Sequence, residues 1–302
     1  MAAVSLALAA VAAGCNATSS VLQRKANRED SPDLPFGLRL LVDLVRRPIW
    51  LLGGLAMLAS FLLQAAALGL GTLSSVEPVL ALELPLTLMI GSAVFHHPLR
   101  VRDWMSAAAL GAGLGMFIGA LSPSGGDAAQ IRPAVAALAS GGTVVGVVAL
   151  ALFAHFGPAR SRAALYGAAA GSGFGLTASM IKVSVSKLST DGAAGLFSAW
   201  ETYGVAVAGV GSLVLVQAAL HFGTLIAVQP GLTLMDPLVS LLWGTVVLGE
   251  TTRTGPILLV AAAGAAVIAV AVVVLARSSA AADNAESGRE TCSAAAVTEG
   301  TA

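Results

Sequence analysis

Apolar stretches of about twenty residues recur along this chain and constrain its fold more than any other feature. A helix needs roughly 20 consecutive apolar residues to cross a bilayer, and hydropathy predicts nine such spans. They run over about 2–22, 49–68, 71–96, 104–121, 133–156, 163–186, 195–219, 222–248 and 255–276. Spans of this length must satisfy their backbone polar groups internally, so we expect helices. The sequence predicts an all-α polytopic membrane protein.

Charged residues are too few for a water-soluble protein. They make up 11% of the 302 residues, against about 25% in soluble domains. The formal net charge is zero, which argues against nucleic acid as a partner. The two cysteines, Cys15 and Cys292, lie in different contexts and predict neither a disulfide framework nor a metal site. The lipid bilayer is the expected environment, and no cofactor is expected.

The Lys and Arg residues predict the orientation. Twelve of the sixteen fall on the side of loop 23–48, three fall on the opposite side, and Lys182 lies within a span. Cytoplasmic loops carry the excess of positive charge. We therefore expect a protein of the cytoplasmic (plasma) membrane, with its N-terminus outside and its C-terminus in the cytoplasm.

The first residues, MAAVSLALAAVAAGC, also resemble a cleaved signal peptide. A signal peptide normally starts with basic residues, and none precedes this apolar run. The run also continues beyond Cys15. We interpret 2–22 as the first span, with cleavage as the alternative.

Two segments repeat one proline-containing frame. GTLSSVEPVLALELPL begins at Gly71, and GTLIAVQPGLTLMDPL begins at Gly223. The copies share most of their apolar residues, but their acidic residues differ in type and position. Because proline removes a helical hydrogen bond, both spans are predicted to kink at their shared prolines. These are Pro78, Pro85, Pro230 and Pro237.

Weaker matches extend the repeat. QAAALGLGTL at Gln64 matches QAALHFGTL at Gln217, and ATSSVLQ (17–23) matches LTASMIK (176–182). Five crossings separate spans one and six, so the repeats are inverted, as in many secondary transporters. The predicted parts are a first repeat over 1–121 with its cytoplasmic loop 23–48, a linking span over 133–156, a second repeat over 163–276, and a disordered cytoplasmic tail over 277–302.

Ionisable residues inside the spans are the candidate site residues, because charge in the hydrocarbon core is costly and usually functional. Glu83 and Asp236 lie near the middle of their spans, the depth at which repeat-built transporters bind substrate. Each lies close to a proline. We expect them to form a cation or proton site. The full set is Glu77, Glu83, Lys182, Glu201 and Asp236.

Lys182, Glu201 and Glu77 each have two interpretations. Lys182 and Glu201 lie at matching depths on either side of the hairpin around Asp191, so an ion pair is one. Alternatively, Lys182 is a partner of the substrate or of Glu77. Glu77 itself is either part of the site or hydrated near the headgroups.

Uncharged polar side chains form a stripe on span one. Asn16, Ser19, Ser20 and Gln23 follow helical spacing and face either a cavity or a neighbouring helix. The matched residues Gln64 and Gln217 carry the same two interpretations.

Glycine recurs every fourth residue in two spans. One series is Gly111, Gly115 and Gly119; the other is Gly167, Gly171 and Gly175. Neither has the Lys-Ser/Thr ending of a phosphate-binding loop. Both series predict close helix packing.

The segment VQPGLTLMDPLVSLLWGTVVLGE (228–250), followed by a Gly-rich last helix, resembles the drug/metabolite transporter (EamA-like) superfamily. SSVLQRKA (19–26), followed by RRPIWLLGGLAMLASFLLQAAALGLGTLSSVEPVLALELPL (46–86), is similar to its NIPA-like magnesium transporter branch. The resemblance covers about 5–276 and implies an inverted-repeat fold and alternating access. It places the last Glu of the motif at Glu250, whose position at a helix end implies a structural role. The matching position of the first repeat is Pro98.

The favoured function is a secondary transporter of a small solute, driven by a gradient because the sequence has no P-loop. The alternative substrate is Mg²⁺, which needs only one or two carboxylates. Glu83 and Asp236, with Asn16 or Gln229, would then be its ligands. We expect that the protein is not an enzyme, with a membrane-embedded enzyme as a distant alternative. A homodimer is compatible with the sequence.

Overall fold

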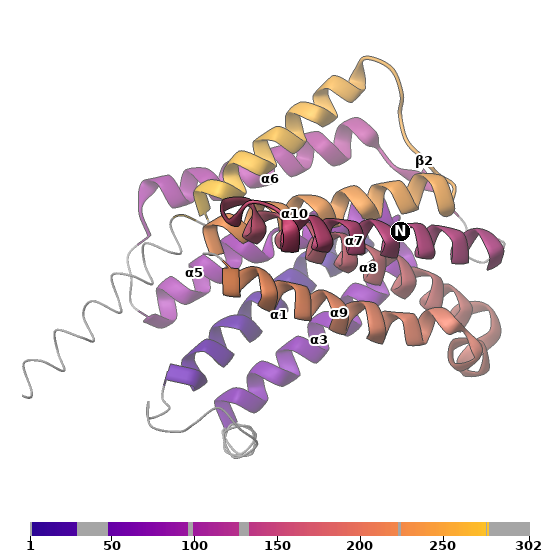
Figure 1. The fold of residues 1–302 in the computed structure, drawn as a ribbon, viewed down its shortest axis with the longest axis horizontal. Helices are drawn as coiled ribbons and strands as arrows, with labels where there is room; N and C mark the ends of the chain where they lie inside the picture. Colours follow the sequence, from indigo (N-terminus) through magenta and orange to yellow (C-terminus); the bar gives the residue numbers. More distant parts are fainter. Residues whose placement is uncertain are drawn as a thin grey trace, which may run out of the picture.

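The described helices run mainly side by side (Figure 1). A computed structural model describes residues 2–28, 48–95, 99–126, 133–222, 225–275 and 277. Its elements are α1 (Ala2–Arg28), α3 (Pro48–Leu70), α4 (Leu73–Leu80), α5 (Glu83–Phe95), α6 (Val101–Leu121), β1 (Ser124–Gly125), α7 (Pro133–Phe156), α8 (Ala159–Ser198), α9 (Trp200–Phe222), α10 (Leu225–Leu242), the π-helical turn η2 (Trp243–Val247), β2 (Glu250–Thr251) and a last helix (Ile257–Leu275).

Seven segments of the described chain are long and apolar enough to cross a bilayer. The other two predicted spans, 163–186 and 222–248, fall on α8 and on α10 plus η2. The helix α8 is long enough but not apolar enough, and Gly231–Val247 is apolar but shorter. The chain is an all-helical, multi-pass membrane protein. Most of the predicted loop 23–48 and nearly all of the predicted tail lie outside the described residues.

The predicted span 71–96 consists of two helices. Between α4 and α5 the backbone hydrogen bonds join residues that are three apart instead of four. Ala81 N donates to Pro78 O, Leu82 N to Val79 O and Leu84 N to Ala81 O. Pro85 has no N–H to donate to Ala81 O, so the regular helical pattern cannot continue through this point. The predicted interruption of the first copy is therefore present, and it places Glu83 at the start of α5.

The second copy of the proline frame behaves differently. The helix α10 is continuous from Leu225 to Leu242 and contains both of its prolines, so the expected break at Asp236–Pro237 is absent. The irregularity lies further on, in η2, where Leu248 N donates to Trp243 O. Trp243 Nε1 also donates to Thr143 Oγ1 at 3.0 Å, which ties η2 to α7.

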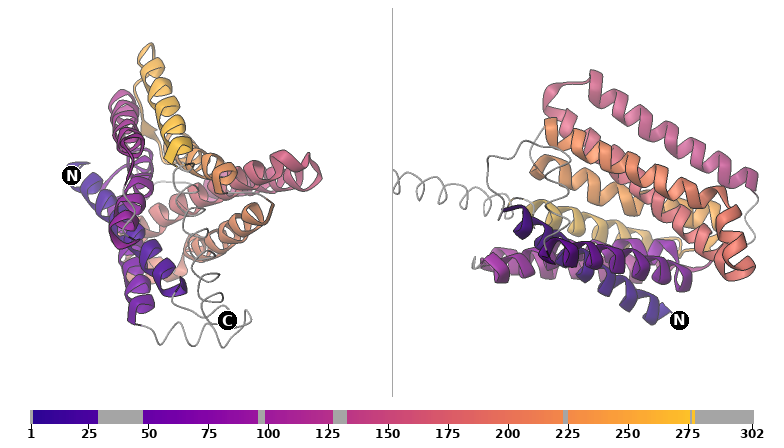
Figure 2. Two further views of the ribbon diagram at one scale, coloured as in Figure 1. Left: turned by 90° about the vertical axis from the view of Figure 1, so that its left-hand side faces the viewer. Right: turned by 90° about the horizontal axis from the view of Figure 1, so that it is seen from below.

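The two halves of the chain form separate groups of helices. In Figure 2 the early helices α1, α3 and α5 lie together, and α8, α9 and α10 form a second group beside them. The short helix α4 lies between the groups and contacts α1, α3 and α6 as well as α8 and α10. Its residues from Leu73 to Val79 are all buried. α4 therefore contacts both groups; α3 with α8, and α6 with the last helix, also join the two halves.

The glycine series of α8 packs directly on α10. A Cβ atom at Gly167, Gly171 or Gly175 would lie 2.5, 2.4 or 2.7 Å from the backbone oxygen of Val228, Leu232 or Asp236, respectively. The prediction of close packing is confirmed for this series. The absence of side chains lets the backbones of α8 and α10 approach, as in other membrane helix pairs.

The glycine series of α6 does not pack in this way, so that prediction is wrong. A Cβ atom at Gly111, Gly115 or Gly119 would meet nothing within 4 Å. The close contact is made by Gly113, where a Cβ atom would lie 2.9 Å from Gly264 O in the last helix. Four-residue spacing identified a helix face, but not which face meets a neighbour.

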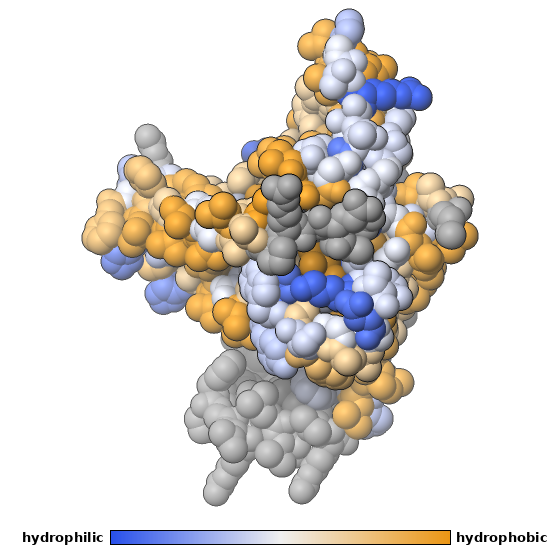
Figure 3. Space-filling view, turned by 90° about the vertical axis from the view of Figure 1, so that its right-hand side faces the viewer, coloured by the Kyte–Doolittle hydropathy of each residue, from blue (hydrophilic) through white to orange (hydrophobic). Residues whose placement is uncertain are grey.

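Large apolar side chains cover the outside of the helices. Leu55 of α3, Phe153 of α7 and Val207 of α9 are 62%, 72% and 74% exposed, respectively. Seen end-on, hydrophobic residues cover much of the projecting helices, whereas hydrophilic residues gather on parts of the end face (Figure 3). Exposed apolar flanks of this kind are what a bilayer would cover.

Candidate functional site

A pair of carboxyl groups lies where the two halves meet. Glu77 is on α4 and is 4% exposed, and Gln64 Nε2 of α3 donates a hydrogen bond to its Oε1 at 3.2 Å. The carboxyl group of Asp236, on α10, lies within hydrogen-bonding reach of Glu77. The interpretation of Glu77 as a hydrated headgroup residue is wrong, because α4 is enclosed by helices of both halves.

Asp236 has an oxygen atom without a partner. Its Oδ1 is buried and accepts no hydrogen bond from the described residues, and the hydroxyl of Ser240, one helical turn further along α10, likewise has no partner among them. A buried polar atom without a partner costs about 1–3 kcal/mol, so such atoms are few in native proteins and often mark a functional site or a bound water. These two atoms lie one turn apart on α10, and Asp236 is the residue beside the Glu77 carboxyl group.

A direct hydrogen bond between the carboxyl groups of Glu77 and Asp236 would require a proton. An ionised carboxylate can only accept hydrogen bonds, so two carboxyl groups can bond to each other only when one of them carries a hydrogen. Without that proton, two negative charges would face each other in a region of low dielectric, where their repulsion is strong. The pair can therefore hold one proton, or a cation in its place.

Glu83 belongs to a separate pair. Asn16 Nδ2 of α1 donates to Glu83 Oε2 at 2.7 Å. Glu83 is the first residue of α5, where the partial positive charge of the helix start favours a carboxylate. No hydrogen bond between described residues joins Glu83 to Asp236. The two acids predicted to share one site thus have different partners, since Asp236 faces α4 and Glu83 faces α1.

Lys182 does not pair with Glu201, as one interpretation proposed. Its Nζ donates to the backbone oxygens of Leu68, at 2.8 Å, and Gly71. These atoms lie at the end of α3, where the partial negative charge of a helix terminus attracts a cation. Glu201 pairs instead with Lys187, with 3.0 Å between Nζ and Oε2.

Glu250 holds the first turn of α4. Its carboxylate accepts hydrogen bonds from Leu73 N, from Ser74 N at 3.1 Å and from Ser74 Oγ at 2.6 Å. It is 3% exposed. The structural role implied by the family resemblance agrees with this geometry, but the helix that it caps lies 176 residues away in the sequence.

The remaining polar candidates are dispersed. Gln23 Nε2 donates to Ser19 Oγ on its own helix at 3.0 Å, and Gln217 is exposed. The side chain of Gln229 lies outside the described part of the chain. Sequence reasoning missed Ser240; its position one turn after Asp236 on the same face is the signal that could have found it.

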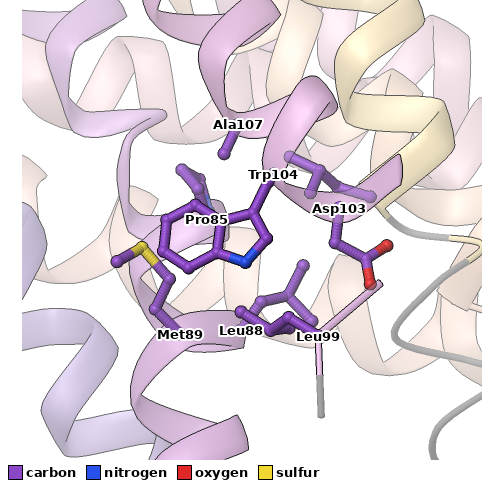
Figure 4. A pocket seen from close by; sticks show the side chains of 8 residues that line it. Pro85, Leu88, Met89, Leu99, Asp103, Trp104 and Ala107 are labelled. Carbon is purple, nitrogen blue, oxygen red and sulfur yellow. The ribbon is translucent and has the colours of Figure 1, made fainter. Parts of the chain in front are cut away.

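A small hollow lies at another place, between α5, α6 and the last helix. Pro85, Leu88, Met89, Leu99, Trp104, Ala107 and Leu275 give it an apolar lining, joined by Asp103 (Figure 4). Asp103 Oδ2 accepts the backbone N–H of Arg100, 2.9 Å away, and so caps the start of α6. Because its single acid is already used by a helix start, we do not assign substrate binding to this hollow.

The described residues include no group of three or more His, Cys, Asp or Glu side chains placed to hold a metal ion. Oxygen ligands for a cation would therefore come from a carboxyl pair and uncharged oxygens. At the centre of the molecule these are the carboxyl groups of Glu77 and Asp236 and the hydroxyl of Ser240.

Comparisons with known proteins give one informative match. An uncharacterized protein of Corynebacterium glutamicum is 29% identical over 212 residues, which cover 70% of this chain and 72% of the relative. No protein-family model matches the chain. No solved structure matches it. The chain is thus similar to a bacterial protein over most of both lengths, and that protein's name assigns no activity.

Proposed function

We propose that this chain is a secondary transporter, and not an enzyme, that moves a small solute across the cytoplasmic membrane by alternating access. The observation that carries the proposal is the meeting of Glu77 and Asp236, from the two halves of the chain, in its buried centre. Acidic residues at such depth are costly and typically mark ion or substrate pathways.

The helix arrangement supports a division into two inverted repeats, over 1–121 and 163–276, linked by 133–156. The sequence offset of 152 residues relates position 113 to position 265, and Gly113 packs against Gly264, one residue away. Near-equivalent positions that pack on each other are expected around a pseudo-twofold axis. This arrangement is also what membership of the drug/metabolite transporter superfamily would require, and we propose that family.

The carboxyl pair suggests how solute movement is driven. A proton between Glu77 and Asp236 bridges the two halves, whereas a bound cationic group could replace it. Removal of both leaves two like charges in contact, which favours separation of the halves and hydration of the site. Exchange of a proton for a solute would thereby be coupled to the movement of one half against the other.

Uptake into proteoliposomes tests this proposal. Vesicles containing the protein are placed in a mixture of small metabolites under an imposed pH gradient, and the accumulated compounds are identified by mass spectrometry. We expect at least one compound to accumulate with the unmodified protein and not with the Glu77→Gln, Asp236→Asn double variant. Equal accumulation with both correctly folded proteins would refute the proposal.

A specific observation also favours Mg²⁺ as a second candidate substrate. Asp236 Oδ1 and Ser240 Oγ are buried oxygens without a partner among the described residues, and the Glu77 carboxyl group lies next to Asp236. Mg²⁺ prefers oxygen ligands with one or two carboxylates. Lys182, the cation that would repel Mg²⁺, is bound to backbone oxygens of α3. Vesicles with a trapped Mg²⁺-sensitive dye, with and without a pH gradient, distinguish this candidate from an organic solute.

A further inference from the structure

Two oppositely charged residues hold the turn between α3 and α4 from its two sides. Lys182 of α8 donates to Leu68 O and Gly71 O at the end of α3. Glu250, which follows η2, accepts from Leu73 N and Ser74 N at the start of α4. Both residues come from the second half of the chain, and both reach into the first half. We call these contacts the corner clamp.

Electrostatics favour every contact of the corner clamp. A helix end carries partial negative charge and a helix start partial positive charge, so a Lys at the first and a Glu at the second are each stabilised. Hydrogen bonds to charged groups are also stronger than those between neutral groups. The charges of Lys182 and Glu250 lie close enough to attract each other.

The corner clamp is also tightly packed. A Cβ atom at Gly244 would lie 2.4 Å from both Glu250 Oε2 and Ser74 Oγ, and one at Gly71 would lie 2.7 Å from Ser5 Cβ of α1. Glycine at these two positions lets η2 and α1 close around the turn. A side chain at Gly244 would displace Glu250 and Ser74, and one at Gly71 would displace Ser5 of α1.

The corner clamp lies next to the carboxyl pair. Glu77 is three residues after Ser74, and therefore almost one turn further along α4. All residues of α4 from Leu73 to Val79 are buried. Movement of this turn away from α8 and η2 would therefore open a way to Glu77 from the α3–α4 end of the molecule.

We propose that the corner clamp is the gate that closes the α3–α4 end of the transport pathway. This inference rests on the proposed function. The gate is closed in the structure. To open it, Lys182 and Glu250 must release the helix ends and become hydrated, because a buried charge without a partner is strongly unfavourable. The clamp is therefore either made or broken, which is the behaviour that a gate needs.

Accessibility of α4 tests the gate independently of transport. Ser75 is buried on α4, and its hydroxyl bonds only within the same turn, to Thr72. In a background with Cys15→Ser and Cys292→Ser, the Ser75→Cys variant is treated with a membrane-impermeant thiol reagent, in vesicles of each orientation. The reaction rate is then compared after Glu250→Gln or Lys182→Met.

We expect either clamp variant to raise the reaction rate about tenfold or more from one side, the factor expected for loss of one charge-assisted hydrogen bond. Lys187→Met is the matched control, because it removes a Lys of the same helix that pairs with Glu201 and not with the turn. Equal rates in the unmodified, control and both clamp proteins would overturn the gate.

The labelling and uptake results separate the two proposals. A faster reaction in the clamp variants, with no uptake that depends on Glu77, supports a clamp that opens and refutes the transport proposal. Uptake that depends on Glu77, with labelling unchanged, refutes the gate and leaves the transport proposal standing. Chromatography and circular dichroism identify variants that have not folded. If one clamp variant fails to fold, the other gives the answer.

Discussion

The carboxyl groups of Glu77 and Asp236 lie within hydrogen-bonding reach of each other, although 159 residues separate them in the sequence. One is on α4 of the first half and the other is on α10 of the second half. This contact is the only direct link that we have found between acidic side chains of the two halves among the described residues. The predictions below follow from it and from its surroundings.

Neutralising either member of the pair should abolish solute uptake. Glu77→Gln and Asp236→Asn keep the size of the side chain but cannot exchange a proton, so we expect a loss of flux of about a hundredfold or more, the lower end for removing a positioned proton-transfer group. Asp191→Asn, at an exposed position, is the matched control and should retain full flux. Retained uptake in both pair variants would exclude the pair from the mechanism.

Removal of the Glu250 carboxylate should destabilise the protein. Glu250→Ala leaves the amides of Leu73 and Ser74 without their acceptor in a buried position, with an expected loss of about 1–3 kcal/mol. Thermal melting in detergent, followed by size-exclusion chromatography, measures the change. The neighbouring Thr251→Val variant removes an exposed hydroxyl that bonds Ser124 O and should melt within about a degree of the unmodified protein, since exposed contacts contribute little. Equal melting temperatures of Glu250→Ala and Thr251→Val would contradict the role of Glu250 as the cap of α4.

The two glycine series should respond differently to alanine. Gly171→Ala places a Cβ atom 2.4 Å from Leu232 O, so α8 and α10 must separate and stability must fall. Gly115→Ala meets nothing within 4 Å and gains helix propensity of about 1 kcal/mol, so it should melt at the same or a higher temperature. A melting-temperature difference of the opposite sign would contradict the packing described here.

The pair of Asn16 and Glu83 should behave as a unit. Asn16→Leu removes the amide that donates to Glu83 Oε2 at 2.7 Å, so the Glu83 carboxyl group loses this hydrogen bond. Asn16→Leu combined with Glu83→Leu removes both polar groups. Loss of both partners can be nearly neutral when the loss of one is not. We expect the double variant to melt above the Asn16→Leu variant. Additive losses in this double-mutant cycle would show that the two side chains are independent.

Much of the fold follows from the sequence because lipid allows few alternatives. The predicted spans fall on helical segments, although 71–96 is divided between α4 and α5 and 195–219 begins within α8. The interruption before Pro85 follows from the missing N–H of proline. The same rule gave a wrong result at Asp236–Pro237, where α10 continues. The helix α10 packs on the glycine series of α8, and the local sequence around Asp236–Pro237 does not report this contact.

The members of the site could be predicted better than their partners. Because an ionisable side chain inside a membrane is energetically costly, Glu77, Asp236 and Lys182 were predicted to be functional residues. Depth along a span cannot show the direction of a side chain, however. For this reason the partners were not predicted: Lys182 binds the end of α3 and not Glu201, and Asp236 lies beside Glu77 and not Glu83. Those choices depend on how the helices are rotated, which is set by packing across the whole molecule.

Proton movement through reconstituted protein tests the central claim most directly. Proteoliposomes with a trapped pH-sensitive dye receive Mg²⁺ or one organic solute at a time, and the internal pH is followed for the unmodified protein, Glu77→Gln and Asp236→Asn. The account predicts that at least one solute moves protons, and that either substitution stops this movement while Asp191→Asn does not. Solute-driven proton movement that persists in both pair variants would contradict it.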